Sequence, residues 1–171
     1  MNYCFPTVKT GGLDHQTSAL LELGCIVTDQ QFQELDTFCT YIDGPESLII
    51  EDEALKYNKI KLEDLKDAVP EKTALINFNS LLKQYDYPTF IGYQILFELS
   101  FLNSATFRQK LVLACDGNIV DLMLASRHSE SILYYSLKGI AGYYGIVMNS
   151  DDRLNKARVA IKIAKNLFGG D

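Results

Sequence analysis

The stretch "YCFPTVKTGGLDHQTSALLELGCIV", residues 3–27, decides how the chain begins to fold. Apolar and β-branched runs stand on either side of "TGGLD", so the pattern predicts two strands joined by a glycine turn. A third run follows the turn "TDQQ", which gives an antiparallel meander of residues 3–7, 19–28 and 32–41. The stretch also raises a chemical question, because Thr7 and Lys9 stand at the end of the first strand, where many enzymes place an acid.

The composition fits one compact α/β domain. With 171 residues, 47% of them hydrophobic and 22% charged, the chain can bury a substantial core, and we expect residues 1–171 to form a single domain. The formal net charge is −6, from 22 acids against 16 lysines and arginines. This charge excludes a protein that coats nucleic acid over its whole surface, although it leaves room for a local basic pocket.

The cysteines and the hydropathy pattern indicate a cytoplasmic protein. No C-x-x-C pair occurs, so buried, reduced thiols are favoured over a structural zinc site. The first residues lack a basic segment followed by an apolar one, and no apolar run reaches 18 residues. We therefore expect neither secretion nor a membrane span. The four cysteines are Cys4, Cys25, Cys39 and Cys115.

Helical patterns dominate the second half of the chain. We expect short helical pieces within residues 50–65, helices at 71–84 and 94–110, and a short strand at 89–92. Glu98 lies at the border of the apolar stripe of the 94–110 helix, so its carboxylate needs a partner. The last helix is predicted to begin with Ser150 as N-cap and with Asp151 and Asp152 in its first turn, and Lys156 borders its apolar stripe.

Several segments resemble the motifs of one family. "TVKTGGLD" with "LLELG", residues 7–14 and 20–24, is similar to the first motif, D-x-E-T-T-G-L-D with I-I-E-I-G, of the DnaQ-like DEDD 3′–5′ exonucleases. "FIGYQILFELSFL", residues 90–102, resembles the family's second motif, H-N-x-x-F-D-x-x-F-L. Further similar segments are "ALKYNKIKLEDL" (54–65), "IVDLMLASR" (119–127) and "YSLKGIAGYYGI" (135–146). The resemblance implies an α/β, RNase H-like three-layer fold, with a central mixed five-stranded sheet and helices on both faces.

The positions that match the family's metal-binding active site hold residues of a different chemistry in this sequence. In the family, four acids hold two divalent metals that activate water against a terminal phosphodiester, and a histidine is the general base. The first, second, third and fourth acids fall on Thr7, Lys9, Glu98 and Lys156, and the general base falls on Asp151. The matching binding positions are Gly12, Leu13, Asn58, Tyr93 and Gln94.

This substitution pattern predicts a pocket that is neutral without a metal. Lys9 and Lys156 against Glu98 and Asp151 sum to zero charge, and an ammonium group in the first shell would be repelled by Mg²⁺ or Mn²⁺. We therefore expect no metal or other cofactor, and we expect Glu98 to pair with Lys9 or Lys156 in a shared cleft.

Three functions are consistent with this pattern. The first is a catalytically degenerate exonuclease-like domain that serves as a binding module for a single-stranded nucleic-acid 3′ end or for an unknown partner protein. The second is an active Mg²⁺- or Mn²⁺-dependent 3′–5′ exonuclease with relocated ligands. The third is a structural subunit of a homodimer or larger assembly. The relocated ligands would come from Asp14, Glu22, Glu98, Asp151 and Asp152.

The remaining histidines and tyrosines are assigned no chemistry. His15 and His128 are expected at the surface. Four tyrosines near "GIAG" could stack on bases, but their helical spacing favours packing in the core. These are Tyr134, Tyr135, Tyr143 and Tyr144.

Overall fold

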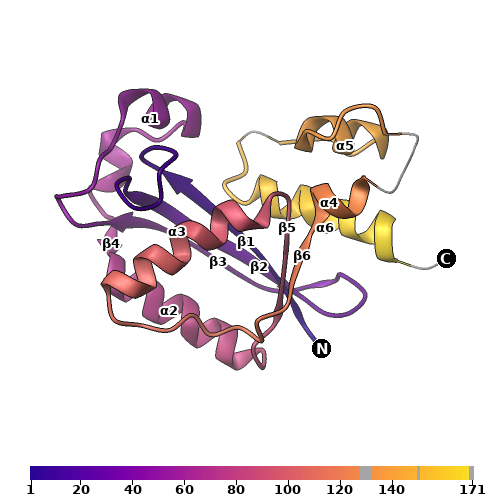
Figure 1. The fold of residues 1–171 in the computed structure, drawn as a ribbon, viewed down its shortest axis with the longest axis horizontal. Coiled ribbons are helices and arrows are strands. Elements are labelled where there is room, and N and C mark those ends of the chain that lie inside the picture. The colour runs from indigo at the N-terminus through magenta and orange to yellow at the C-terminus, as the bar shows by residue number, and fades with distance from the viewer. Residues whose placement is uncertain (128–131, 150, 170–171) are drawn as a thin grey trace.

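The computed structural model describes residues 1–127, 132–149 and 151–169. Its centre is a six-stranded sheet in the order β4-β3-β2-β1-β5-β6 (Figure 1). β1, β2 and β3 are antiparallel, whereas β5 and β6 continue the sheet in parallel with β1, and β4 pairs in parallel with the end of β3. The strands are β1 Tyr3–Thr10, β2 Leu20–Thr28, β3 Glu34–Asp43, β4 Val69–Pro70, β5 Thr89–Gly92 and β6 Ile119–Asp121.

Helices cover both faces of the sheet, which makes three layers (Figure 1). On one face lie α2 and α3, and on the other lie α4, α5 and α6, with α6 packed against β1. The helices are α1 Asp52–Asn58, α2 Glu71–Gln84, α3 Ile95–Arg108, α4 Leu122–Ser126, α5 Leu137–Tyr143 and α6 Asn155–Phe168, and a 3₁₀ turn spans Leu62–Leu65.

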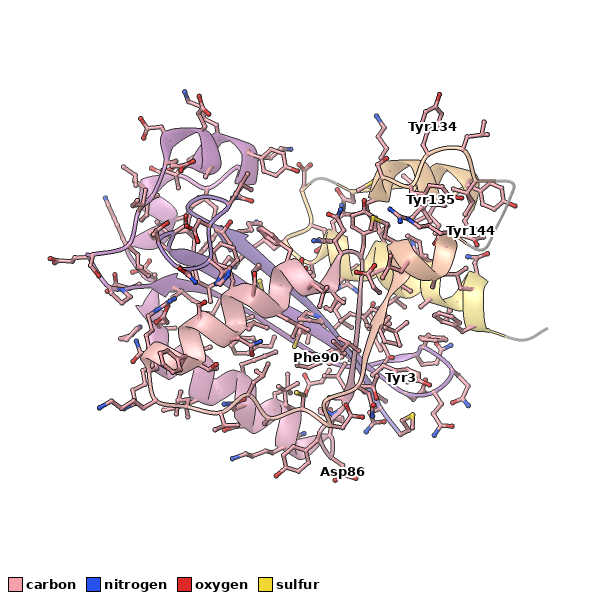
Figure 2. The ribbon with its side chains drawn as sticks, in the orientation of Figure 1. Tyr3, Asp86, Phe90, Tyr134, Tyr135 and Tyr144 are labelled. Carbon is pink, nitrogen blue, oxygen red and sulfur yellow. The ribbon has the colours of Figure 1, made fainter. Side chains whose placement is uncertain are left out.

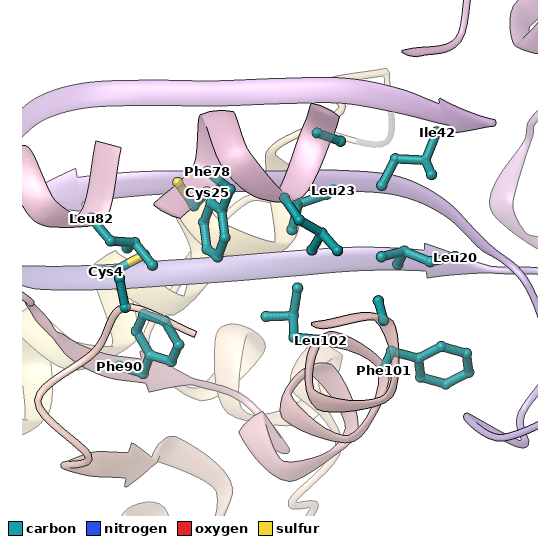
Figure 3. Close-up of a cluster of buried hydrophobic side chains, with 14 of the residues drawn as sticks. Cys4, Leu20, Leu23, Cys25, Ile42, Phe78, Leu82, Phe90, Phe101 and Leu102 are labelled. Atoms are coloured by element: carbon teal, nitrogen blue, oxygen red, sulfur yellow. The ribbon is translucent and has the colours of Figure 1, made fainter. Parts of the chain in front are cut away.

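Alternation along the strands divides the core in two. Cys4 of β1 lies on the side of α2 and α3, in one apolar cluster with Phe78, Phe90 and Leu102 (Figure 3). The next residue, Phe5, faces α6 and joins a second apolar cluster. Successive strand side chains point to opposite faces, so β1 and β2 supply both clusters. The same alternation places Thr7 and Lys9 on the side of Phe5, toward α6.

The predicted fold class is confirmed, with a difference in the edges of the sheet. The described chain has six strands where five were predicted. β4 and β6 contain only two and three residues, which is too few to show a periodic pattern in the sequence. The third strand begins at Glu34 because Phe32 adopts a left-handed turn conformation (φ 57°). From that turn Phe32 stacks on Tyr3, with ring centroids 5.3 Å apart.

The predicted start of the last helix is wrong. The helix α6 begins at Asn155, so Asp151 and Asp152 precede it. One oxygen of Asp152 accepts the N–H of Leu154 at 2.9 Å, and the other accepts from Arg158 at 2.8 Å, which fixes the entry to the helix. The predicted N-cap, Ser150, lies outside the described residues.

The prediction that the four tyrosines pack in the core is also wrong for two of them. Tyr134 is 75% exposed and Tyr143 is 48% exposed. Figure 2 shows Tyr134 pointing away from the body of the protein beside α5. His15, predicted at the surface, is half-buried, and its ring Nδ1 forms a hydrogen bond with the Ser104 hydroxyl. His128 lies outside the described residues. Within the described part of the chain, no helix has the length and apolar character needed to cross a membrane.

Candidate functional site

Three polar side chains form a row across the sheet near the end of β1. Lys9, Glu22 and Tyr41 are direct neighbours in the register of β1, β2 and β3, so they point to the same face. Every residue of β2 is buried, and Glu22 is the charged residue of that strand. A carboxylate at this place requires cations close by, because an unpaired buried charge is costly.

Two cations neutralise Glu22. The Lys9 ammonium lies 3.2 Å from the Glu22 carboxylate, and the Nε of Arg153 donates to the same group at 2.8 Å. The Arg153 guanidinium carbon also lies 3.9 Å from the centre of the Tyr41 ring, a cation–π contact. Arg153, just before α6, therefore covers Glu22 and Tyr41 on the α6 side of the sheet. Lys9 therefore pairs with Glu22, and of the two lysines predicted as possible partners of Glu98 it is Lys156 that forms the pair.

The second ion pair joins α3 to α6. Gln94 adopts a left-handed conformation (φ 50°) and turns the chain from β5 into α3, so Glu98 stands in the first turn of that helix. Glu98 is only 1% exposed, and its Oε1 accepts a hydrogen bond from the Lys156 ammonium. Its Oε2 is buried and has no hydrogen-bond partner among the described residues.

Burial controls the protonation of Glu98. Loss of solvent raises the pKa of this carboxyl above its ordinary value, Lys156 opposes that rise, and the charge of Asp121 adds to it. Asp121 is held in place because its carboxylate caps α4 by accepting the N–H groups of Met123 and Leu124. Glu98 therefore has one ammonium partner, Lys156, and a second carboxylate, Asp121, close enough to raise its pKa.

The position predicted to match the family's first acid, Thr7, lies in a closely packed part of the sheet. Thr7 is buried, and its partner in the register is Gly24. A Cβ at Gly24 would lie 2.6 Å from the side chain of Leu154 and 3.0 Å from the Thr7 hydroxyl oxygen. Glycine is therefore needed there so that Leu154 can pack beside Thr7.

The residues at these positions do not fit a two-metal centre. They offer a buried hydroxyl, two ammonium groups and one carboxylate that Lys156 already occupies. Two divalent cations need several carboxylate oxygens in their first shell. In the described part of the chain, no group of three or more histidine, cysteine or acidic side chains could hold a metal ion.

The relocated ligands do not form such a set either. Asp14 lies in the exposed turn after β1, where its carboxylate accepts the N–H of Gln16 at 2.8 Å. Asp152 is engaged by Arg158, and Glu22 by Lys9 and Arg153. Asp151 is exposed, and its own N–H donates to Asn149.

The five residues predicted to bind a ligand fall into two groups, those that hold the scaffold together and those that are exposed. Asn58 donates to the Thr10 carbonyl at 2.9 Å and Tyr93 donates to the Tyr135 carbonyl at 3.0 Å, so both side chains tie the scaffold together. A Cβ at Gly12 would lie 2.5 Å from the Ser18 hydroxyl oxygen, so this position needs glycine for close packing. By contrast, Leu13 is 85% exposed and Gln94 is also exposed. These two side chains reach solvent, although the Gln94 amide also donates to the Met123 sulfur at 3.6 Å.

Sequence reasoning missed Arg153. It lies 131 positions from Glu22, and no periodic pattern links a residue before α6 to one in β2. The available signal was the single acid within the apolar strand "LLELGCIVT", which required cations from elsewhere in the fold.

The family of the chain follows from this fold and from a comparison of its sequence. A family model described as Exonuclease (RNase T) matches residues 10–149, and the chain belongs to the DnaQ-like 3′–5′ exonuclease family. No curated protein matches it.

Solved structures of exonuclease I share the fold. E. coli exonuclease I in complex with a dT13 oligonucleotide matches with a TM-score of 0.82 and 15% identity, over 97% of this chain and 41% of that one. A complex of exonuclease I with SSB-Ct matches with a TM-score of 0.81 and 16% identity, over 98% of this chain and 42% of that one. The present chain thus spans less than half the length of these proteins.

Proposed function

We propose that this chain is a catalytically inactive exonuclease-fold domain that binds the 3′ end of a single nucleic-acid strand without cleaving it. The observation that carries the proposal is the hydrogen bond from Lys156 to Glu98, because it joins the third and fourth acid positions of the family through an ammonium group. The charge that metals supply elsewhere in the family is here supplied by side chains.

The charge balance supports binding without metal. Four acids at the family positions would carry four negative charges before any metal bound. In this chain, Lys9, Arg153 and Lys156 balance Glu22, Glu98 and Asp121, three charges against three. A phosphate group that approached this neutral site would not be repelled as it would be by four acids.

The absence of catalysis is tested with a labelled single-stranded oligonucleotide, as DNA and as RNA, in Mg²⁺ or Mn²⁺. We expect no shortening above buffer, because neither ammonium can ligate a metal. Glu98→Ala is the control, since a trace activity that survives this change comes from a contaminant. Robust cleavage that Glu98→Ala abolishes would establish an active enzyme and overturn the proposal.

Binding is tested separately by fluorescence anisotropy of the same oligonucleotides in EDTA. We expect binding that EDTA leaves unchanged and that Leu13→Ser weakens, since Leu13 is the most exposed of the binding positions. Leu62→Ser is the control, because Leu62 is 68% exposed and lies in the 3₁₀ turn. If no strand binds even at low salt, nucleic acid is not the ligand, and the protein partner considered from the sequence takes its place.

A further inference from the structure

The helix α3 carries apolar side chains on its outward face as well as on its buried one. Leu96 and Phe107 lie 11 positions apart, about three helical turns, and are 62% and 85% exposed. Val112, in the loop after α3, is 87% exposed. The opposite side of α3, with Phe101 and Leu102, is already buried against the sheet (Figure 3). The outward side therefore has no partner within the described residues.

A hollow lies beside these projecting side chains. Its volume is about 260 Å³, and it opens between α3, the loop after it and the edge strand β6. Phe90, labelled in Figure 2, lies on β5 and lines the hollow together with Leu99, Leu113 and Ile119. Leu99 and Asn103 belong to the same outward stripe of α3 as Leu96 and Phe107. Projections and hollow thus share one face.

The charges of this face favour a second copy of the chain over nucleic acid. Residues 109–119 contain one cation and one acid, Lys110 and Asp116. Within the described part of the chain Lys110 has no ion pair, and Asp116 accepts only from the uncharged Thr89 and Asn118. Arg108 is already engaged by Glu71. A nucleic-acid surface would need several free cations, which this face does not provide.

Two copies of a chain with a net charge of −6 repel each other over most of their surface. They can meet where the local charge is balanced and apolar area is available, and this face offers both. A two-fold axis brings the same patch of both copies together, so a patch that contains its own projection and its own hollow can be self-complementary.

We propose that this α3 face, formed by Leu96, Phe107, Val112 and the adjoining hollow, is a self-association surface of the protein. Phe107 or Val112 of each copy enters the hollow of the other, and Lys110 faces Asp116 across the axis. The proposal does not depend on the function proposed for the Glu22 and Glu98 ion pairs.

The test is the mass of the protein by sedimentation velocity over about a hundredfold range of concentration. We expect a monomer–dimer equilibrium, with Phe107→Glu and Val112→Asp each weakening self-association by at least about tenfold. Lys110→Glu should weaken it as well, because like charges would then face each other. Circular dichroism checks that each variant remains folded, which is expected because both apolar side chains are exposed.

Tyr57→Glu is the matched control, since Tyr57 is 89% exposed and lies on α1, away from this face. It should leave the equilibrium unchanged. A wild-type protein that stays monomeric over the whole range would overturn the proposal. A dimer that the Phe107 and Val112 variants leave intact, or that Tyr57→Glu disrupts equally, would also overturn it.

Discussion

At the scale of single residues, the two buried carboxylates of the site differ in how they are satisfied. Glu22 is shared by Lys9 and Arg153, whereas among the described residues Glu98 has Lys156 alone and one oxygen without a hydrogen bond. An acid with two cations keeps one when the other is removed, but an acid with a single cation becomes an unpaired buried charge. The two ion pairs should therefore respond differently to mutation.

Lys156→Met should destabilise the protein by about 2 kcal/mol, because it leaves the Glu98 charge buried without a partner. The value is discounted from that of a fully buried pair, since 34% of the Lys156 side chain reaches solvent. Thermal or urea unfolding measures the change. Lys162→Met on the exposed side of α6 is the control and should have almost no effect. Equal stability of the two variants would show that Glu98 does not depend on Lys156.

The direction in which pH alters the stability loss of Lys156→Met follows from the pKa of Glu98. Burial raises the pKa of Glu98, so the folded protein holds that proton more firmly than the unfolded chain does. Glu98 therefore contributes stability that is present below its unfolded pKa and is lost as pH rises through its folded pKa. Removal of Lys156 raises that pKa further. The difference in melting temperature between wild type and Lys156→Met should be largest at neutral pH and should narrow as the solution becomes acidic.

For Glu22 we expect synergy between its two cations. Lys9→Met and Arg153→Met should each cost about 1 kcal/mol or less, because the other cation remains. The double variant should cost more than the sum of the two, since Glu22 is then a charge within a fully buried strand. A double-mutant cycle in urea measures the coupling free energy. Strict additivity would mean that solvent reaches Glu22 when the cations are gone.

At the scale of elements, a charged contact also fastens α2 to α3. Glu71, at the start of α2, is 2% exposed, and Arg108, at the end of α3, donates to both of its oxygens at 2.8 and 2.6 Å. Gln109 donates to the same carboxylate at 2.9 Å. This geometry is bidentate, the strongest arrangement of an arginine with a carboxylate.

Arg108→Met should therefore cost about 3 kcal/mol, because only the Gln109 amide would still bind the buried Glu71 carboxylate. Chemical denaturation measures the loss, and Lys72→Met, at an exposed position of α2, is the control. Hydrogen exchange should show faster opening in α2 and α3 before β1 and β2 are affected. An unchanged free energy of unfolding would argue that Glu71 is solvated when Arg108 is absent.

The elements that could be predicted from the sequence are those with a long and regular period. Residues 71–84 form α2 over the predicted range, and the strand at 89–92 also has its predicted bounds. The start of α6 could not be predicted, because Asp152 suits a first helical turn but is held by Arg158 ahead of the helix. The exposure of Tyr134 could not be predicted either, since periodicity does not show whether an apolar face has a partner.

At the scale of the whole molecule, the sequence predicts the scaffold of the site better than its contacts. The burial of Glu98 and its need for a cation follow from its place beside an apolar stripe. Which lysine reaches it depends on how α6 crosses the sheet, and Lys9 instead lies across from Glu22 in the antiparallel register. Pairs as distant as Glu22 and Arg153 are set by the complete fold, which local patterns do not encode.

Metal binding tests, in the protein as a whole, the proposal that side-chain cations replace metal at this site. Mg²⁺ in the millimolar range should not raise the wild-type melting temperature above that in a monovalent salt of matched ionic strength, because the described residues offer no set of metal ligands at the site. The triple variant Thr7→Asp, Lys9→Glu, Lys156→Asp places acids at all four family positions. Without divalent ions it should be less stable than wild type, since these acids repel one another and Glu22 loses Lys9. Mn²⁺ should then restore part of the lost stability, by mass action on the folded state. Calorimetry measures Mn²⁺ binding to both proteins. If Mn²⁺ bound the wild type and stabilised it as much as the triple variant, Lys9 and Lys156 would not exclude metal.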